Sequence, residues 1–277
     1  MERIRRGWRL AKQSLKVVWS DPALAVLVVM GIVLAALVAL PLMIAGGIVS
    51  EGDEPSAVAW ILIGIGVYLG YTVTIFFGVG IVHAAGLVLD GRDATVGESI
   101  GFAFKRLGPI LGWSVVGTAV SLFLAFLRSR GVAGAILAGI GGAAWSLITF
   151  LAVPVITFEG LGPIATLKRS AALFRQRWGE QITGNVGIGL VFFLLSLPGL
   201  LVAGVGLAVA QGSASIVGWV LVVIGVLAVL VVAIVGRAAS AAFGAVLYRY
   251  AASGETSPHF AEGDLRSIAQ PAPARLL

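Results

Sequence analysis

Six stretches of the chain are apolar over lengths that can cross a lipid bilayer. A membrane-spanning helix needs about 20 mostly apolar residues, because each residue rises about 1.5 Å along a hydrocarbon core about 30 Å thick. Only 12% of the residues are charged, against about 25% in soluble domains, which excludes a soluble globular enzyme. We therefore predict an all-α membrane protein with six transmembrane helices, over residues 22–46, 57–89, 109–127, 131–158, 182–210 and 216–250.

Short connections join these predicted spans in pairs. Residues 51–55, 128–130 and 211–215 are the short connections, and each is too brief to hold a further element. Connections of this length join neighbouring antiparallel helices. The spacing therefore predicts three antiparallel helical hairpins.

Nearly all of the basic residues fall on one side of this arrangement. Of the 19 lysines and arginines, seventeen lie in the segments 1–21, 90–108, 159–181 and 237–277, whereas Arg128 and Arg130 lie in the opposite loops. Cytoplasmic loops of membrane proteins carry such an excess. We expect both termini to be cytoplasmic, in a multi-pass protein of the prokaryotic plasma (inner) membrane. The net charge of +6 then indicates anionic membrane lipids as partners, and no nucleic acid.

Each predicted hairpin is preceded by a basic segment with one apolar helical face. We predict an N-terminal interfacial helix over 1–21, a membrane domain over 22–252 with interfacial helices near 95–107 and 163–178, and a disordered cytoplasmic tail over 253–277. Thr95 with Glu98 fits a capping box, and Pro163 suits a first helical turn.

Cations beside the apolar faces indicate helices that lie in the lipid headgroup layer. The alternative is that these helices cap the bundle by packing on it, and both arrangements are compatible. The predicted contacts with lipid headgroups are Arg5, Arg9, Lys12, Lys16, Lys105, Arg106, Lys168, Arg169, Arg175 and Arg177.

The ends of three spans resemble one another, which indicates an internal repeat. Residues 87–91 and 156–160 both end in an acidic residue followed by glycine, and 246–250 is similar. The repeated unit is a surface helix, a span, a short turn and a second span. Two spans exceed the bilayer, since a helix over 57–89 reaches about 50 Å. We expect their continuations, 81–89 and 238–250, to pack against the interfacial helices as a cytoplasmic collar.

Ionisable groups inside or beside a membrane span are functional candidates by default. Arg237 is interpreted as a ligand for a lipid phosphate or anionic substrate, or as a side chain that reaches the inner interface. His83 either relays protons or bonds a neighbouring helix. Glu159, like Asp90, either pairs with nearby cations or caps its helix. Asn185 is placed to hydrogen-bond across helices.

The residues needed for most catalytic sites are missing from the sequence. The chain has no cysteine and two histidines, and it carries no phosphate-binding loop or metal-binding motif. We therefore expect a protein that is not an enzyme, with no catalytic residues, no metal and no cofactor.

Residues 154–163 (Pro-Val-Ile-Thr-Phe-Glu-Gly-Leu-Gly-Pro), followed by Lys168-Arg169-Ser170 and Trp178-Gly179-Glu180, carry a resemblance to a known group. Over most of residues 5–252 the chain resembles an uncharacterised prokaryotic family of six-span integral membrane proteins. That family is distantly similar to the membrane domain attached to some glycerophosphodiester phosphodiesterases. The resemblance implies a polytopic membrane protein and supplies no catalytic residues, because the phosphodiesterase barrel is absent from this sequence.

The sequence leaves two functional hypotheses open. The first is a non-enzymatic protein that organises, scaffolds or shapes the membrane through basic amphipathic helices on the cytoplasmic leaflet. The alternative is a transporter or channel for a small solute or lipid, motivated by the repeated hairpins, the proline at 198, Arg237 and His83. Small-residue helix faces also predict a homo-oligomer.

Overall fold

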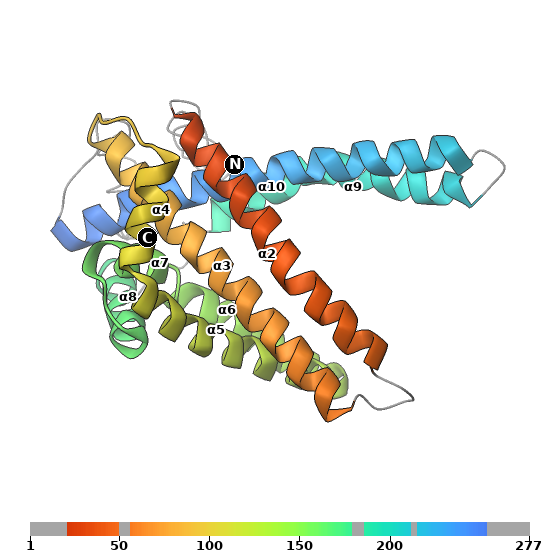
Figure 1. The fold of residues 1–277 in the computed structure, drawn as a ribbon, viewed down its shortest axis with the longest axis horizontal. Coiled ribbons are helices and arrows are strands. Elements are labelled where there is room, and N and C mark those ends of the chain that lie inside the picture. Colours follow the sequence, from red (N-terminus) through yellow and green to blue (C-terminus); the bar gives the residue numbers. More distant parts are fainter. Residues whose placement is uncertain (1–20, 50–55, 179–185, 212–214, 254–277) are drawn as a thin grey trace, which may run out of the picture.

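A computed structural model describes residues 21–49, 56–178, 186–211 and 215–253 (Figure 1). Every regular element in these ranges is a helix, which confirms the predicted all-α class. The helices are α2 (Pro22–Val49), α3 (Ala57–Leu89), α4 (Val96–Lys105), α5 (Leu107–Arg128), α6 (Gly131–Ile148), α7 (Ala152–Glu159), α8 (Pro163–Trp178), α9 (Val186–Ala210) and α10 (Ser215–Ser253). The predicted N-terminal helix over 1–21, apart from its last residue, and the predicted tail lie outside the described residues.

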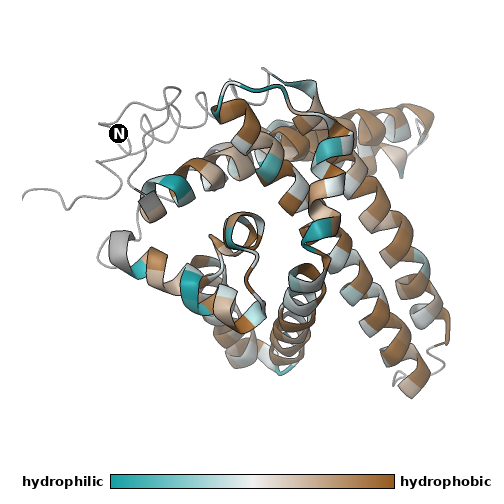
Figure 2. Ribbon diagram, turned by 60° about the vertical axis from the view of Figure 1, so that its left-hand side comes forward, coloured by the Kyte–Doolittle hydropathy of each residue, from teal (hydrophilic) through white to brown (hydrophobic). Residues whose placement is uncertain are grey.

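Six helical segments of the described chain are long and apolar enough to cross a membrane. They are α2, α3, α5, the stretch from α6 through α7, α9 from Phe192, and α10. Most residues along these long helices are hydrophobic (Figure 2). The chain is thus a multi-pass membrane protein by the length and composition of its helices.

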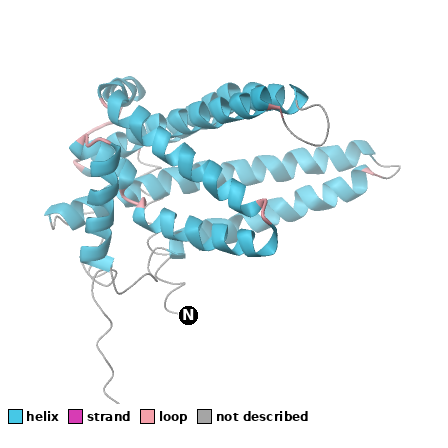
Figure 3. Cartoon of the chain, turned by 90° about the horizontal axis from the view of Figure 1, so that it is seen from below, coloured by secondary structure: helices cyan, strands magenta, loops and turns pink. Residues whose placement is uncertain are grey.

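Consecutive long helices lie side by side. α2 packs along α3 and α9 along α10, and α5 lies beside α6. The pairs diverge from a common end, and the far ends of their helices lie on the opposite side of the molecule (Figures 1 and 3). Small residues permit the close approach: a Cβ on Gly70 would lie 2.8 Å from the Cβ of Ala39. Gly66 permits a similar approach, because a Cβ there would lie 3.1 Å from the Ala39 carbonyl oxygen.

The fourth predicted span, 131–158, is present, but it is interrupted between α6 and α7. α6 ends at Ile148 and α7 starts at Ala152, with hydrogen-bonded turns between them. Pro154 explains the break, because proline has no N–H for the carbonyl four residues earlier and its ring displaces that carbonyl. The proline is accommodated in the first turn of α7, where a missing donor costs little.

The main core lies where the helices converge. The last turns of α3, from Phe77 to Leu89, and of α10, from Ala238 to Ala251, supply most of its buried side chains. Leu173 of α8 is also buried in this core, and Ile100 of α4 packs against the core. The end of α3 packs against α4 as expected, whereas the end of α10 packs mainly against α3. The side of the membrane that these ends face stays a prediction.

A second, smaller core lies between α3, α5 and α7, with Ile75, Trp113 and Ile156 among its buried members. Trp113 of α5 and Trp145 of α6 stack with their ring centres 5.9 Å apart. Trp145 thus serves helix packing, as its position in the middle of an apolar run indicates.

Candidate functional site

Polar side chains tie the helix ends together at the end of the bundle that holds the main core. Asp21 caps α2 by accepting a hydrogen bond from the Ala23 amide at 2.8 Å, and it also accepts one from the Ala94 amide at 2.7 Å. Its side chain is buried, so both bonds are shielded from water. The start of α2 is thereby fixed to the segment that leads into α4, where Thr95 accepts from the Glu98 amide as predicted.

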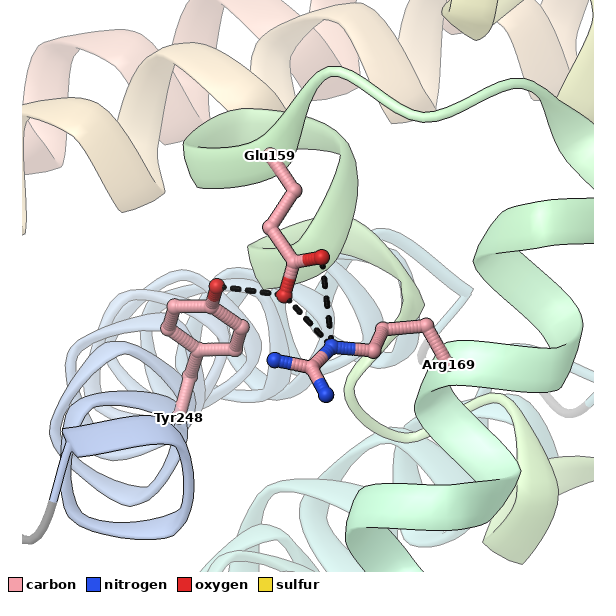
Figure 4. Close-up of polar contacts among 3 residues, drawn as sticks. All are labelled: Glu159, Arg169 and Tyr248. Atoms are coloured by element: carbon pink, nitrogen blue, oxygen red, sulfur yellow. Dashed lines mark hydrogen bonds and ion pairs between the residues drawn. The ribbon is translucent and has the colours of Figure 1, made fainter.

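Glu159, the last residue of α7, connects three helices (Figure 4). Its carboxylate accepts from Nε of Arg169 on α8 at 2.8 and 3.2 Å, and from the Tyr248 hydroxyl on α10 at 2.7 Å. The hydrogen bond with Glu159 raises the pKa of the Arg169 guanidinium. The pairing expected for Glu159 is confirmed.

Asp90, directly after α3, makes a matching ion pair with Arg249 of α10. Nη2 of Arg249 donates to Oδ2 at 2.9 Å and to the Gly86 carbonyl at 3.3 Å. These hydrogen bonds hold the pKa of the Asp90 carboxyl below its ordinary value. The guanidinium carbon also lies 5.8 Å from the ring centre of Phe158, whose ring stacks on Tyr248.

The three similar span ends found in the sequence meet at this point. The acidic residues of the first two copies, Asp90 and Glu159, bind two consecutive residues of the third, Arg249 and Tyr248. Each acidic residue is followed by a glycine with positive φ, 71° at position 91 and 65° at position 160. We refer to this set as the polar collar, with Asp21, Asp90, Arg106, Glu159, Arg169, Tyr248 and Arg249 as its members.

Arg106 fixes the junction between α4 and α5 to α7. Its Nε donates to the Thr157 carbonyl at 3.2 Å. A Cβ on Gly160 would overlap the Arg106 guanidinium, so this glycine makes room for it. The side chain of His83 makes no hydrogen bond with any described residue; its ring stacks on Phe102 of α4 with ring centres 3.9 Å apart.

The predicted headgroup contacts fall into three groups. Lys105, Lys168 and Arg175 are exposed on α4 and α8, whereas Arg106 and Arg169 are engaged in the polar collar. For Arg177 the structure describes only the backbone in α8. The remaining predicted residues, Arg5, Arg9, Lys12, Lys16 and the membrane candidate Asn185, lie outside the described residues. Their contact with lipid stays a prediction.

Arg237 lies in a groove between α9 and α10, away from the polar collar. The groove has a volume of about 410 Å³. Sequence reasoning singled out the arginine but missed the rest of the groove, because the other lining residues come from packing across two helices. The lining residues are Phe192, Phe193, Ser196, Val229, Val232, Ala233, Gly236, Arg237 and Ser240.

The paired side chains of the polar collar hold helices together, and the exposed cations are suited to bind anions. Both carboxylates at the centre of the polar collar are occupied by arginine. Within the described ranges, no three histidine or carboxylate side chains gather closely enough to hold a metal ion. The exposed cations Lys105, Lys168 and Arg175, by contrast, lie at surfaces that an anion can reach.

A family model matches residues 56–258 and so spans α3 through α10, including the whole pairing of Asp90, Glu159, Tyr248 and Arg249. The chain belongs to DUF6159, a family of unknown function. None of the curated proteins and none of the solved structures compared with the chain matches it. Membership of an uncharacterised family is therefore established, and the distant similarity to a phosphodiesterase membrane domain gains no support.

Proposed function

We propose that this DUF6159 protein is a non-enzymatic membrane protein that organises or shapes the bilayer. The observation that carries the proposal is the pairing of exposed cations with exposed apolar side chains on α4 and α8. Phe104 is 61% exposed beside Lys105, and Ile164 is 58% exposed one turn before Lys168. A helix with this surface inserts its apolar residues among lipid chains while its cations contact anionic headgroups.

Rigid attachment of α8 to the bundle supports an effect on membrane shape. The Ser170 hydroxyl donates to the Ile148 carbonyl, and Arg169 pairs with Glu159. A wedge that is fixed to transmembrane helices transmits the displacement of one leaflet to the whole protein. In this proposal the polar collar faces the cytoplasmic leaflet of a prokaryotic inner membrane, each hairpin follows an interfacial helix, and copies of the chain associate.

The size of the electrostatic contribution decides how many charges must be removed to test it. Each lysine or arginine near an anionic membrane surface contributes about 1 kcal/mol. The three exposed cations Lys105, Lys168 and Arg175 together supply about 3 kcal/mol, or roughly a hundredfold in affinity for anionic lipid. Single substitutions are therefore too weak, and a triple substitution is needed.

Reconstitution into vesicles tests the proposal. The wild type at rising protein density should cluster or deform vesicles that contain phosphatidylglycerol, as seen by cryo-electron microscopy, but not vesicles of pure phosphatidylcholine. The triple variant Lys105→Gln, Lys168→Gln, Arg175→Gln should lose the effect. The matched control, Arg128→Gln with Arg130→Gln, removes charge at the opposite end and should retain it. Unchanged vesicles with the wild type, or equal loss in the control, would contradict the proposal.

A transporter or channel for a small solute or lipid is the second candidate function. The open groove at Arg237 favours it, because a charged side chain beside an apolar groove is a feature of transport pathways. A fluorescent-lipid scrambling assay and solute efflux from loaded vesicles test this candidate. Rates equal to those of protein-free vesicles would remove it.

The similarity to the phosphodiesterase membrane domain enters the proposal only as an architectural expectation. It contributes no catalytic residue to this chain, so hydrolysis of glycerophosphodiesters is not part of the proposed function.

A further inference from the structure

α10 changes its environment at Arg237. The large apolar side chains that α10 exposes lie between Ile216 and Val231, whereas its buried apolar side chains lie between Ala238 and Ala251. The helix from Ile216 to Gly236 is about 32 Å long at about 1.5 Å per residue, close to the thickness of a hydrocarbon core. Arg237 therefore follows the lipid-exposed part of the helix directly, at the depth where lipid phosphates lie.

The surroundings of Arg237 suit an amphiphile better than a small polar solute. Ser240 lies nearly one turn further along α10 and brings a second polar group to the groove, while the Ser196 hydroxyl is engaged with the Phe193 carbonyl. The part of the groove that lies on the N-terminal side of Arg237 along α10 is apolar and includes Val229 and Val232. One end of the groove thus offers a cation and a hydroxyl, and the other offers hydrocarbon.

Arg237 differs from the arginines of the polar collar in having no anionic partner among the described residues. Arg169 pairs with Glu159 and Arg249 with Asp90, but no hydrogen bond or ion pair joins Arg237 to another described side chain. A guanidinium at the edge of the hydrocarbon core with no carboxylate beside it attracts an anion of opposite charge. The charge and the depth both point to a phosphate.

We propose that the groove between α9 and α10 binds one anionic phospholipid. The phosphate accepts hydrogen bonds from the Arg237 guanidinium and the Ser240 hydroxyl, and an acyl chain lies along Val229 and Val232. Charge complementarity selects an anionic lipid over a zwitterionic one, and the apolar wall selects a lipid over free phosphate. This site is separate from the exposed cations of α4 and α8 and does not depend on the proposed membrane-shaping function.

Native mass spectrometry of the full-length protein in detergent tests the site. Wild type should retain one phosphatidylglycerol at least tenfold more tightly than phosphatidylcholine, and Arg237→Gln should lose that one tightly bound lipid. The matched control Arg128→Gln removes a cation at the opposite end of the bundle by the same substitution and should behave as wild type. Inorganic phosphate at equal concentration should not compete with the lipid.

A second variant keeps the test independent of charge. Ala233→Phe fills the groove without altering Arg237, so it should also weaken retention of phosphatidylglycerol. The Arg237 side chain makes no hydrogen bond or ion pair with a described residue. Without added lipid, Arg237→Gln should therefore melt at the wild-type temperature. It should lose only the increase in melting temperature that phosphatidylglycerol causes in wild type. Equal retention by wild type and Arg237→Gln, equal loss in Arg128→Gln, displacement by inorganic phosphate, or full retention by Ala233→Phe would each overturn the proposal.

Discussion

Two glycines at equivalent positions of the repeat, Gly91 and Gly160, allow a sharp test of the polar collar. Both have positive φ, 71° and 65°, which costs an L-residue about 1–2 kcal/mol. They differ in their surroundings: a Cβ at Gly91 meets nothing within 4 Å, whereas one at Gly160 would overlap the Arg106 guanidinium. Substitution to alanine therefore perturbs the backbone in the same way at both positions, but it causes a steric conflict only at position 160.

The difference between the two variants follows from the bond that Arg106 loses. To admit a methyl group at 160, the guanidinium must move away from the Thr157 carbonyl, to which Nε donates at 3.2 Å. A hydrogen bond from a charged donor contributes about 1.5–3 kcal/mol when buried and less when partly exposed, as here. We expect Gly91→Ala to lower the free energy of unfolding by about 1–2 kcal/mol, and Gly160→Ala by about 1–2 kcal/mol more.

Equilibrium unfolding in mixed micelles of mild detergent and dodecyl sulfate measures both values. The same pair of substitutions in an Arg106→Ala background provides the control, because the conflict disappears with the guanidinium. In that background the two alanine variants should differ by less than about 0.5 kcal/mol. Equal destabilisation in the wild-type background, or an unchanged difference without Arg106, would refute the reasoning.

Three further perturbations have defined outcomes. Glu159→Gln and Tyr248→Phe should show a coupling of about 1 kcal/mol in a double-mutant cycle by the same unfolding assay, and additivity would contradict their contact. The arginine paired with Asp90 lowers the pKa of its carboxyl, so the pair stabilises the fold above the ordinary carboxylate pKa. As pH falls from 7 through that lowered pKa, the melting temperature of wild type should decrease more than that of Asp90→Asn; parallel curves would contradict this. Gly225→Val should destabilise by more than 2 kcal/mol, since its Cβ would meet backbone of α9, whereas Gly204→Val, in open space, should change stability by less than about 1 kcal/mol.

Local sequence patterns predicted those features at this end of the bundle that depend on neighbouring residues. The Thr95 cap and the start of α8 at Pro163 follow from residues within one helical turn. Asp90 and Glu159 were expected to pair because an acidic residue at a helix end, before a glycine, has cations of adjacent segments within reach. The six apolar segments were identified by length and composition alone.

Features that depend on contacts between distant segments were not predictable from the sequence. Tyr248 and Arg249 are 89 and 159 residues away from the acids they bind, so no spacing rule links them. The interruption between α6 and α7 was missed because an apolar run hides the effect of Pro154 on backbone hydrogen bonding. The groove at Arg237 required the position of Phe192 across from Gly236, which only helix packing determines.

The proposed function requires that the end of the bundle with the polar collar faces the cytoplasmic leaflet, where Lys105 and Lys168 contact lipid headgroups. The chain has no cysteine, so single cysteines can be introduced at positions 105, 168 and 129 without background. In intact cells, a membrane-impermeant maleimide should label Ser129→Cys, and should label Lys105→Cys and Lys168→Cys only after the cells are opened. Labelling of 105 and 168 in intact cells, with 129 protected until the cells are opened, would contradict the orientation and with it the proposed function.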